Sequence, residues 1–108
     1  MTYVFDIDGT ICSKTDGDYS KAKPLHDRIK KINNLYDDGH TIVFLTARGM
    51  GRHKNNFLHA QRDFFDLTYS QLERWGAKYH QLFLGKPSGD YYIDDKGVND
   101  EDFFNTRD

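Results

Sequence analysis

Short apolar runs alternate with segments of helical periodicity along this chain. Residues 2–6, 41–45, 81–84 and 91–93 form such runs and predict four strands. Strands that alternate with helical segments are typical of a parallel sheet with crossover helices. The pattern therefore predicts an α/β fold around a small parallel sheet.

The segment between the first two strands has the pattern of a helix. Pro24 suits a first helical position, because the N–H that it lacks would be unpaired there in any case. Gly39 is a suitable residue just beyond the last turn. The apolar residues that recur at helical spacing are Leu25, Ile29, Ile32 and Tyr36. A strand–helix–strand crossover of this kind is almost always right-handed.

The second half of the chain is less regular. Residues 49–66 contain glycines that weaken a helix, but also aromatic residues that share a helical face. Thr68 followed by Gln71 resembles a capping box and predicts a helix start at that point. Near the end, the Phe103-Phe104 pair predicts a short segment that packs on the sheet.

Composition narrows the class of protein. The 108 residues are 37% hydrophobic with a net charge of −2, which suits one domain over residues 1–108 and gives no general attraction to nucleic acid or an anionic membrane. No apolar run approaches the ~20 residues that span a bilayer, and no signal peptide precedes the first strand, so we expect a cytoplasmic protein without a membrane partner. Cys12 is the only cysteine and is interpreted as a packed side chain.

An Asp-x-Asp-Gly-Thr sequence follows the first predicted strand. Side chains alternate along a strand, so Asp6 and Asp8 start on the same side. Gly9 permits a sharp turn that leaves both carboxylates at the carboxyl end of the strand. Taken alone, two acids and a glycine after a strand are as typical of a helix-capping turn as of a site.

The three later strands end in residues suited to a phosphate or a metal. Thr46 ends the second strand, Lys86 follows the third, and Asp94-Asp95 follows the fourth. The carboxyl ends of strands in an open parallel sheet meet in one crevice. The chain therefore offers carboxylates, a hydroxyl, an ammonium group and two further carboxylates to one place.

These four segments resemble the motifs of the haloacid dehalogenase superfamily, whose members are mainly Mg²⁺-dependent phosphatases. The resemblance extends over nearly the whole chain. The Thr46-Ala47-Arg48 triplet and the Gly-Lys-Pro and Tyr-Ile-Asp-Asp sequences are also similar to small capless phosphatase-like proteins associated with bacterial capsule biosynthesis. The resemblance implies a Rossmann-like core without a cap domain.

The resemblance also implies roles for individual residues. Asp6 would be the nucleophile that forms an aspartyl phosphate, and Asp8 the acid/base that protonates the leaving oxygen and then activates water. The implied substrate-binding residues are Thr46, Ala47, Arg48 and Lys86. Arg48 lies two residues beyond Thr46, and we expect it to reach a phosphate or a second anionic group of the substrate.

A divalent cation is expected at the same place. Like charges 4 Å apart cost about 4 kcal/mol at an effective dielectric constant of 20, so gathered carboxylates and a phosphate require a counterion. An all-oxygen ligand set favours Mg²⁺. By resemblance, Asp6, the carbonyl of Asp8 and Asp95 are direct metal ligands, and Asp94 holds Lys86 or a metal-bound water.

We therefore expect a Rossmann-like α/β domain with a small parallel sheet flanked by helices, with sheet order 3-2-1-4 and the site where strand order reverses. The residues between the motifs are nearly used up by the connecting helices, which predicts a capless protein. A site without a cap either admits a large substrate or is closed by a neighbouring subunit, which predicts a homo-oligomer.

The predicted function is a Mg²⁺-dependent phosphomonoesterase acting on a small phosphorylated substrate, a sugar or polyol phosphate, in surface-polysaccharide biosynthesis. One alternative is a nucleic-acid end or nucleotide phosphatase. Another is a phosphorelay receiver, which also combines an acidic pocket with Thr and Lys. In a receiver the acidic pair follows the first strand, whereas here it follows the last predicted one.

Overall fold

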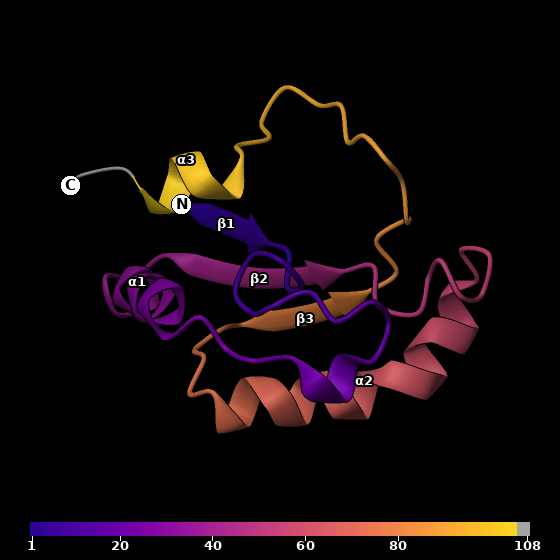
Figure 1. The fold of residues 1–108 in the computed structure, drawn as a ribbon. Coiled ribbons are helices and arrows are strands. Elements are labelled where there is room, and N and C mark those ends of the chain that lie inside the picture. Colours follow the sequence, from indigo (N-terminus) through magenta and orange to yellow (C-terminus); the bar gives the residue numbers. More distant parts are fainter. Residues whose placement is uncertain (106–108) are drawn as a thin grey trace.

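Three parallel strands form the sheet of the computed structural model, which describes residues 1–105 (Figure 1). They are β1 (Thr2–Phe5), β2 (Thr41–Thr46) and β3 (Gln81–Leu84), in the spatial order β1-β2-β3. The register places Phe5 beside Phe44, and Phe44 beside Leu82. The carboxyl ends of all three strands therefore lie at one edge of the sheet.

Three α-helices and one 3-10 turn complete the described structure (Figure 1). Helix α1 (His26–Asp37) connects β1 to β2, and α2 (Phe57–Arg74) connects β2 to β3. The turn η1 (Tyr19–Lys21) lies in the loop after β1, and α3 (Asp100–Phe104) follows the long loop after β3. The first three predicted strands are confirmed, with ends that shift by one residue at most.

Helix α1 begins two residues later than its sequence pattern predicts. Pro24 pairs with Cys12 in an isolated antiparallel bridge, and the N–H of Leu25 donates to the carbonyl of Ile11. These contacts tie the chain to the loop after β1, so the first helical residue is His26. The predicted end of the helix is confirmed, since Gly39 has a φ of 96° directly after the C-cap.

Helix α2 is one continuous helix, and the capping box predicted at Thr68 is wrong. The helix begins after Asn56, whose side chain accepts a hydrogen bond from the N–H of His59. Thr68 lies in the middle of the helix and donates to the carbonyl of Phe64, one turn earlier. The capping motif therefore marks two polar residues, Thr68 and Gln71, that the helix buries.

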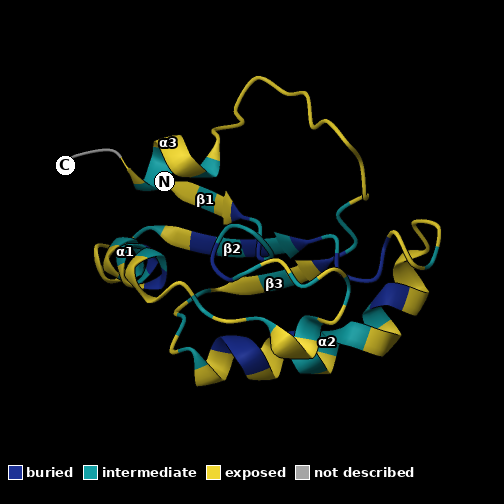
Figure 2. Cartoon of the chain, in the orientation of Figure 1, coloured by how far each residue is buried: buried dark blue, intermediate teal, exposed yellow. Residues whose placement is uncertain are grey.

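The hydrophobic core lies between the helices and one face of the sheet (Figure 2). Ile42 and Phe44 of β2 are fully buried and lie in register with Tyr3 and Phe5 of β1. The helices add apolar residues to this cluster, among them Ile29, Ile32, Leu72, Phe103 and Phe104. The predicted packing of the Phe103-Phe104 segment is confirmed, because the Phe103 ring lies 5.5 Å from that of Phe5.

Residues 91–93 do not form the predicted fourth strand, and the predicted order 3-2-1-4 is wrong within residues 1–105. Tyr91 and Ile93 are 86% and 95% exposed in the loop between β3 and α3. The loop makes local hydrogen bonds instead: Asp94 Oδ1 accepts from the N–H groups of Lys96 and Gly97. Such turns compete with ladder formation, and β1 remains an edge strand.

Among the helices of residues 1–105, none combines the length and the apolar character that a bilayer span requires.

Candidate active site

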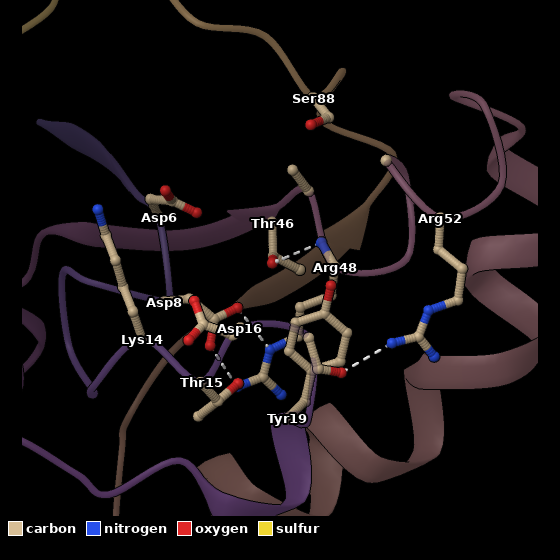
Figure 3. Close-up of a pocket in the computed structure, with 13 residues that line it drawn as sticks. Asp6, Asp8, Lys14, Thr15, Asp16, Tyr19, Thr46, Arg48, Arg52 and Ser88 are labelled. Carbon is tan, nitrogen blue, oxygen red and sulfur yellow. Dashed lines mark hydrogen bonds and ion pairs between the residues drawn. The ribbon is translucent and has the colours of Figure 1, made fainter.

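A cavity of about 520 Å³ lies at the carboxyl ends of β1 and β2 (Figure 3). Four parts of the chain surround it: the ends of the two strands, the loop that contains η1, the segment that leads to α2, and the loop after β3. Its lining residues are Asp6, Asp8, Lys14, Thr15, Asp16, Gly17, Tyr19, Thr46, Ala47, Arg48, Gly51, Arg52 and Ser88. The loop after β1 therefore forms one wall of the cavity.

Asp6 follows the last residue of β1 and directs its carboxylate toward the cavity. Its Oδ1 accepts a hydrogen bond of 2.8 Å from the N–H of Ile7. Burial raises the pKa of the Asp6 carboxyl above its usual value, although the Ile7 N–H and the Lys86 ammonium oppose the rise. A carboxylate in this setting is a stronger base than an exposed one and benefits from a nearby cation.

Lys86 supplies one such cation. Its Nζ lies 3.5 Å from Asp6 Oδ2, and its backbone N–H donates to the carbonyl of Thr46. The chain turns at Gly85, whose φ is 106° and whose Cβ, if present, would lie 2.5 Å from the Phe57 ring. This tight turn brings the end of β3 across the end of β2 toward Asp6.

Asp8 lies beyond the end of β1, where Gly9 with a φ of 79° turns the chain. Both of its carboxylate oxygens bind the guanidinium of Arg48: Nε donates to Oδ2 at 2.9 Å, and Nη2 donates to Oδ1 at 3.0 Å. The Asp8 side chain is still 23% exposed, on the side of the cavity. Arg48 thus fixes the Asp8 carboxylate, and the part of the Asp8 side chain that remains exposed faces the cavity (Figure 3).

The structure places Arg48 differently from its expected role as a group that contacts substrate. Arg48 is 1% exposed, and the guanidinium points into the protein. Its Nη1 donates to Thr68 Oγ1 at 3.1 Å and to Gln71 Oε1 at 2.6 Å, on helix α2. In the sequence these two acceptors have the pattern of a capping box, and their pairing with Arg48 follows only from their burial on α2, since buried polar groups require partners.

Thr46 and Ala47 take the places that the resemblance implies, at the end of β2 beside the cavity. The Thr46 hydroxyl accepts a hydrogen bond of 3.1 Å from the N–H of Arg48. Thr46 is 1% exposed, but it lines the cavity together with Asp6. The ends of β1, β2 and β3 therefore bring Asp6, Asp8, Thr46 and Lys86 together.

Asp94 and Asp95 are not brought to this place, which corrects the expected cluster of four carboxylates. Both are exposed in the loop after β3, and neither lines the cavity. Within residues 1–105 there is no group of three or more His, Cys, Asp or Glu residues that could hold a metal ion. The physical reason is that residues 91–93 do not form a fourth strand, so Asp94 and Asp95 are not placed at the carboxyl edge of the sheet.

Eight residues that line the cavity were not predicted as site residues: Lys14, Thr15, Asp16, Gly17, Tyr19, Gly51, Arg52 and Ser88. Arg52 donates from Nη2 to the carbonyl of Gly17 at 2.8 Å and so joins the two sides of the cavity. The Thr15 hydroxyl is buried and has no hydrogen-bond partner among the described residues. Only the position of Ser88, two residues after Lys86, could have been noticed in the sequence.

Cys12 is a packed side chain, as its sequence context predicts. It is fully buried, and burial together with the neighbouring Asp8 carboxylate raises the pKa of the thiol to about 12. A thiol in that state is protonated and therefore a weak nucleophile.

The residues at the cavity suit a hard divalent cation. Asp6 and Asp8 present oxygen ligands, and the Asp6 carboxylate is poorly solvated. Mg²⁺ is commonly held by one or two protein carboxylates, with waters and substrate phosphate in its other positions. The Asp6 carboxylate, beside a cavity with room for waters and a phosphate, fits an ion of this kind, whereas both carboxylate oxygens of Asp8 are bound by Arg48.

Comparison with known proteins supports the fold. No family model matches the chain, and no curated protein matches it. It is similar to the crystal structure of a structural-genomics target from Vibrio cholerae, with a TM-score of 0.89, 26% sequence identity, and coverage of 98% of this chain and 89% of that one.

The chain is also similar to the D,D-heptose 1.7-bisphosphate phosphatase from B. bronchiseptica, solved with magnesium and phosphate. The TM-score is 0.54 at 19% identity over 82% of this chain, and the chain spans 51% of the length of that phosphatase. The chain thus shares the α/β fold of these two structures, and four polar residues of the predicted motifs gather at the carboxyl ends of its strands.

Proposed function

We propose that this protein is a Mg²⁺-dependent phosphomonoesterase that works through an aspartyl phosphate on Asp6. The observation that supports the proposal most is the meeting of a poorly solvated carboxylate, Asp6, with the Lys86 ammonium beside a cavity that Asp8 and Thr46 also line. A fold shared with a phosphatase is consistent with this chemistry.

The reaction has two steps. An oxygen of Asp6 attacks phosphorus and forms a new P–O bond, while the bond from phosphorus to the leaving oxygen breaks and Asp8 gives that oxygen a proton. Asp8 then takes a proton from water, whose oxygen attacks phosphorus, and inorganic phosphate leaves Asp6. Thr46 donates a hydrogen bond to a phosphoryl oxygen, and Lys86 offsets the negative charge.

Mg²⁺ would be held by the carboxylate of Asp6 and the backbone carbonyl of Asp8. When bound, it supplies positive charge that reduces the repulsion between the carboxylate and the phosphate. The proposed roles of Asp95 as a further ligand and of Asp94 as its neighbour require the loop after β3 to bring them closer than in this structure.

The proposed substrate is a sugar or polyol phosphate. The phosphatase of similar fold is named for a heptose bisphosphate, which is a sugar phosphate. Lys14 and Arg52 line the cavity, and their charges suit a hydrophilic leaving group. The proposed protein is a capless homo-oligomer in the cytoplasm. Its proposed pathway is the biosynthesis of surface polysaccharide. Light scattering in solution tests the subunit number.

Phosphate release from a panel of substrates tests the activity. Sugar, polyol, nucleotide and aryl phosphates are incubated with the protein and Mg²⁺, alongside an Asp6→Asn variant as the control. Turnover of sugar or polyol phosphates that is absent in the variant is the expected result. Preference for nucleotides or for phosphorylated nucleic-acid ends would favour the first alternative.

The lifetime of the phosphorylated protein tests the receiver alternative. An aspartyl phosphate on an enzyme disappears within a turnover, whereas a switch retains it. Rapid quenching with a labelled phosphodonor measures this lifetime. A modification on Asp6 that persists for minutes without catalytic phosphate release would contradict the proposed enzyme.

A further inference from the structure

Arg48, which binds the Asp8 carboxylate, belongs to a network of buried hydrogen bonds. Arg48 carries five N–H donors. Two bind the Asp8 carboxylate, and two bind Thr68 and Gln71. The remaining donor of Nη2 lies 3.9 Å from the Cys12 sulfur.

Arg48 therefore has no donor left for a substrate. Burial leads to the same conclusion, because the Arg48 side chain is 0% exposed and its guanidinium is already bound to Asp8. A bidentate arginine–carboxylate pair fixes the carboxylate in both position and orientation. The guanidinium plane thus determines where the free lone pairs of Asp8 point.

The guanidinium is in turn fixed by two separate parts of the fold. Thr68 and Gln71 on α2 accept from its Nη1, and the Gln71 amide donates to the carbonyl of Tyr19 at 2.7 Å. The Tyr19 ring lies 5.0 Å from the guanidinium carbon. The network thus joins helix α2 and the loop over the cavity to Asp8.

We infer that Arg48 is a positioning residue that aims the Asp8 carboxylate at the leaving oxygen, with Gln71 and Thr68 holding the guanidinium in place. The inference rests on the proposed phosphatase function. It assigns to Arg48 a role in proton transfer through Asp8 and none in binding the substrate.

The leaving group distinguishes this role from a structural one. An alkyl phosphate needs a proton on its leaving oxygen, whereas a nitrophenyl phosphate has a leaving group that departs without one. Loss of aim at Asp8 should therefore lower kcat/KM for the alkyl substrate much more than for the aryl substrate. A general loss of folded protein would lower both equally.

The test is a double-mutant cycle on kcat/KM with glycerol phosphate and nitrophenyl phosphate, using wild type, Arg48→Met, Asp8→Asn and the double variant. We expect Arg48→Met to lower the alkyl value by about 10- to 100-fold and the aryl value by less than about 3-fold, since a positioned acid contributes 10²–10⁴-fold. In the Asp8→Asn background, the same change should have less than about a 2-fold effect.

Two further variants keep the test decisive. Lys78→Met is the matched control, because it breaks the 2.9 Å ion pair with Asp37 near the amino ends of β2 and β3, at the sheet edge opposite the cavity, and should not discriminate between the substrates. Gln71→Met retains the guanidinium but removes its shortest contact, so it should show the Arg48 pattern at about 3- to 10-fold even if Arg48→Met does not fold.

Equal losses from Arg48→Met in both backgrounds, or equal losses on both substrates from Gln71→Met, would overturn the inference while the wild type still released phosphate. A wild type that releases phosphate from neither substrate with Mg²⁺ would instead remove the proposed function, and the inference with it.

Discussion

The Lys86 ammonium lies between the Asp6 carboxylate, at 3.5 Å, and the ring of Tyr92, at 4.2 Å from its centroid. The ring restricts the ammonium from one side while the carboxylate attracts it from the other. The hydroxyl of Tyr92 donates to the carbonyl of Pro87, which closes the loop around Lys86. The loop after β3 thus serves the site through Lys86, although its acidic pair lies elsewhere.

Loss of the Lys86 charge should affect all substrates alike. Lys86→Met keeps most of the aliphatic chain but removes the ammonium from Asp6 and the phosphoryl group. A lost charged hydrogen bond of about 1.5–3 kcal/mol corresponds to about a 10- to 150-fold fall in kcat/KM. Steady-state kinetics on an alkyl and an aryl phosphate measure it.

The exposed Lys96 of the same loop provides the control, since Lys96→Met removes an equal charge from a position away from Asp6. A fall confined to one substrate, or an equal fall in the control, would remove Lys86 from the phosphoryl group.

Replacement of Asp6 should abolish phosphate release and stabilise the fold at neutral pH. Burial raises the pKa of Asp6 above the value of 3.8 that it has in an unfolded chain. The folded state therefore binds this proton more tightly than the unfolded state does. The stability that protonated Asp6 contributes is fully present below pH 3.8 and is lost as the pH rises through the folded-state pKa. The Asn side chain of Asp6→Asn does not ionise, so this variant does not lose stability as the pH rises.

Urea unfolding in the presence of a chelator, from about pH 3 to about pH 7, measures the effect. The stability of Asp6→Asn relative to wild type should rise across this range. Asp18→Asn is the control, because hydrogen bonding to Ser20 lowers the pKa of that carboxyl and the trend should be opposite in sign. A pH-independent difference for Asp6→Asn would contradict the desolvation of the nucleophile.

Local and pairwise features of this fold could be predicted from the sequence. The first three strands and the body of α1 follow from apolar runs and helical spacing, because their side chains face a core on one side. The meeting of Asp6, Thr46 and Lys86 follows from the common carboxyl edge of parallel strands. These features depend on nearest neighbours in the sheet.

The remaining features depend on partners distant in sequence. Tyr91 and Ile93 form an apolar run, but whether it pairs with β1 is decided by the turn at Asp94 and the path of the loop. Arg48 is charged and stands beside Thr46, which suggests a substrate contact. The acceptors that turn it inward, Thr68 and Gln71, lie on a helix whose start the capping pattern misplaced.

Mg²⁺ should be required for turnover and should stabilise the protein. A chelator should abolish phosphate release and Mg²⁺ should restore it. An ion that binds only the folded state adds RT ln(1 + [L]/Kd), about 2.7 kcal/mol at 100 times Kd, so the melting temperature should rise with Mg²⁺. Full activity in metal-free protein would contradict the proposed scheme.

The proposed metal ligand in the loop after β3 has its own test. Asp95→Ala should raise the Mg²⁺ concentration that gives half-maximal activity if the loop brings this carboxylate to the ion. Asp90→Ala removes an exposed carboxylate from the same loop and should leave the Mg²⁺ requirement unchanged. Identical Mg²⁺ titrations for the two variants would place Asp95 outside the metal site, where the structure has it.

The cationic rim of the cavity should determine the charge of the preferred leaving group. Lys14 and Arg52 line the cavity from opposite segments, and the Arg52 guanidinium is anchored by the carbonyl of Gly17. Exposed charges of this kind contribute up to about 1 kcal/mol each, or about 5-fold in affinity. Lys14→Ala and Arg52→Ala should therefore raise KM by about 3- to 5-fold for a substrate whose leaving group carries a second phosphate or carboxylate.

A neutral leaving group should show little change in KM, because it carries no charge for the Lys14 ammonium or the Arg52 guanidinium to attract. Lys30→Ala on the exposed side of α1 removes the same net charge elsewhere and is the control for general electrostatics. The difference between the two substrates should also shrink at high salt, since exposed charges are screened. Equal KM changes for charged and neutral leaving groups would show that the rim cations are solvated surface residues.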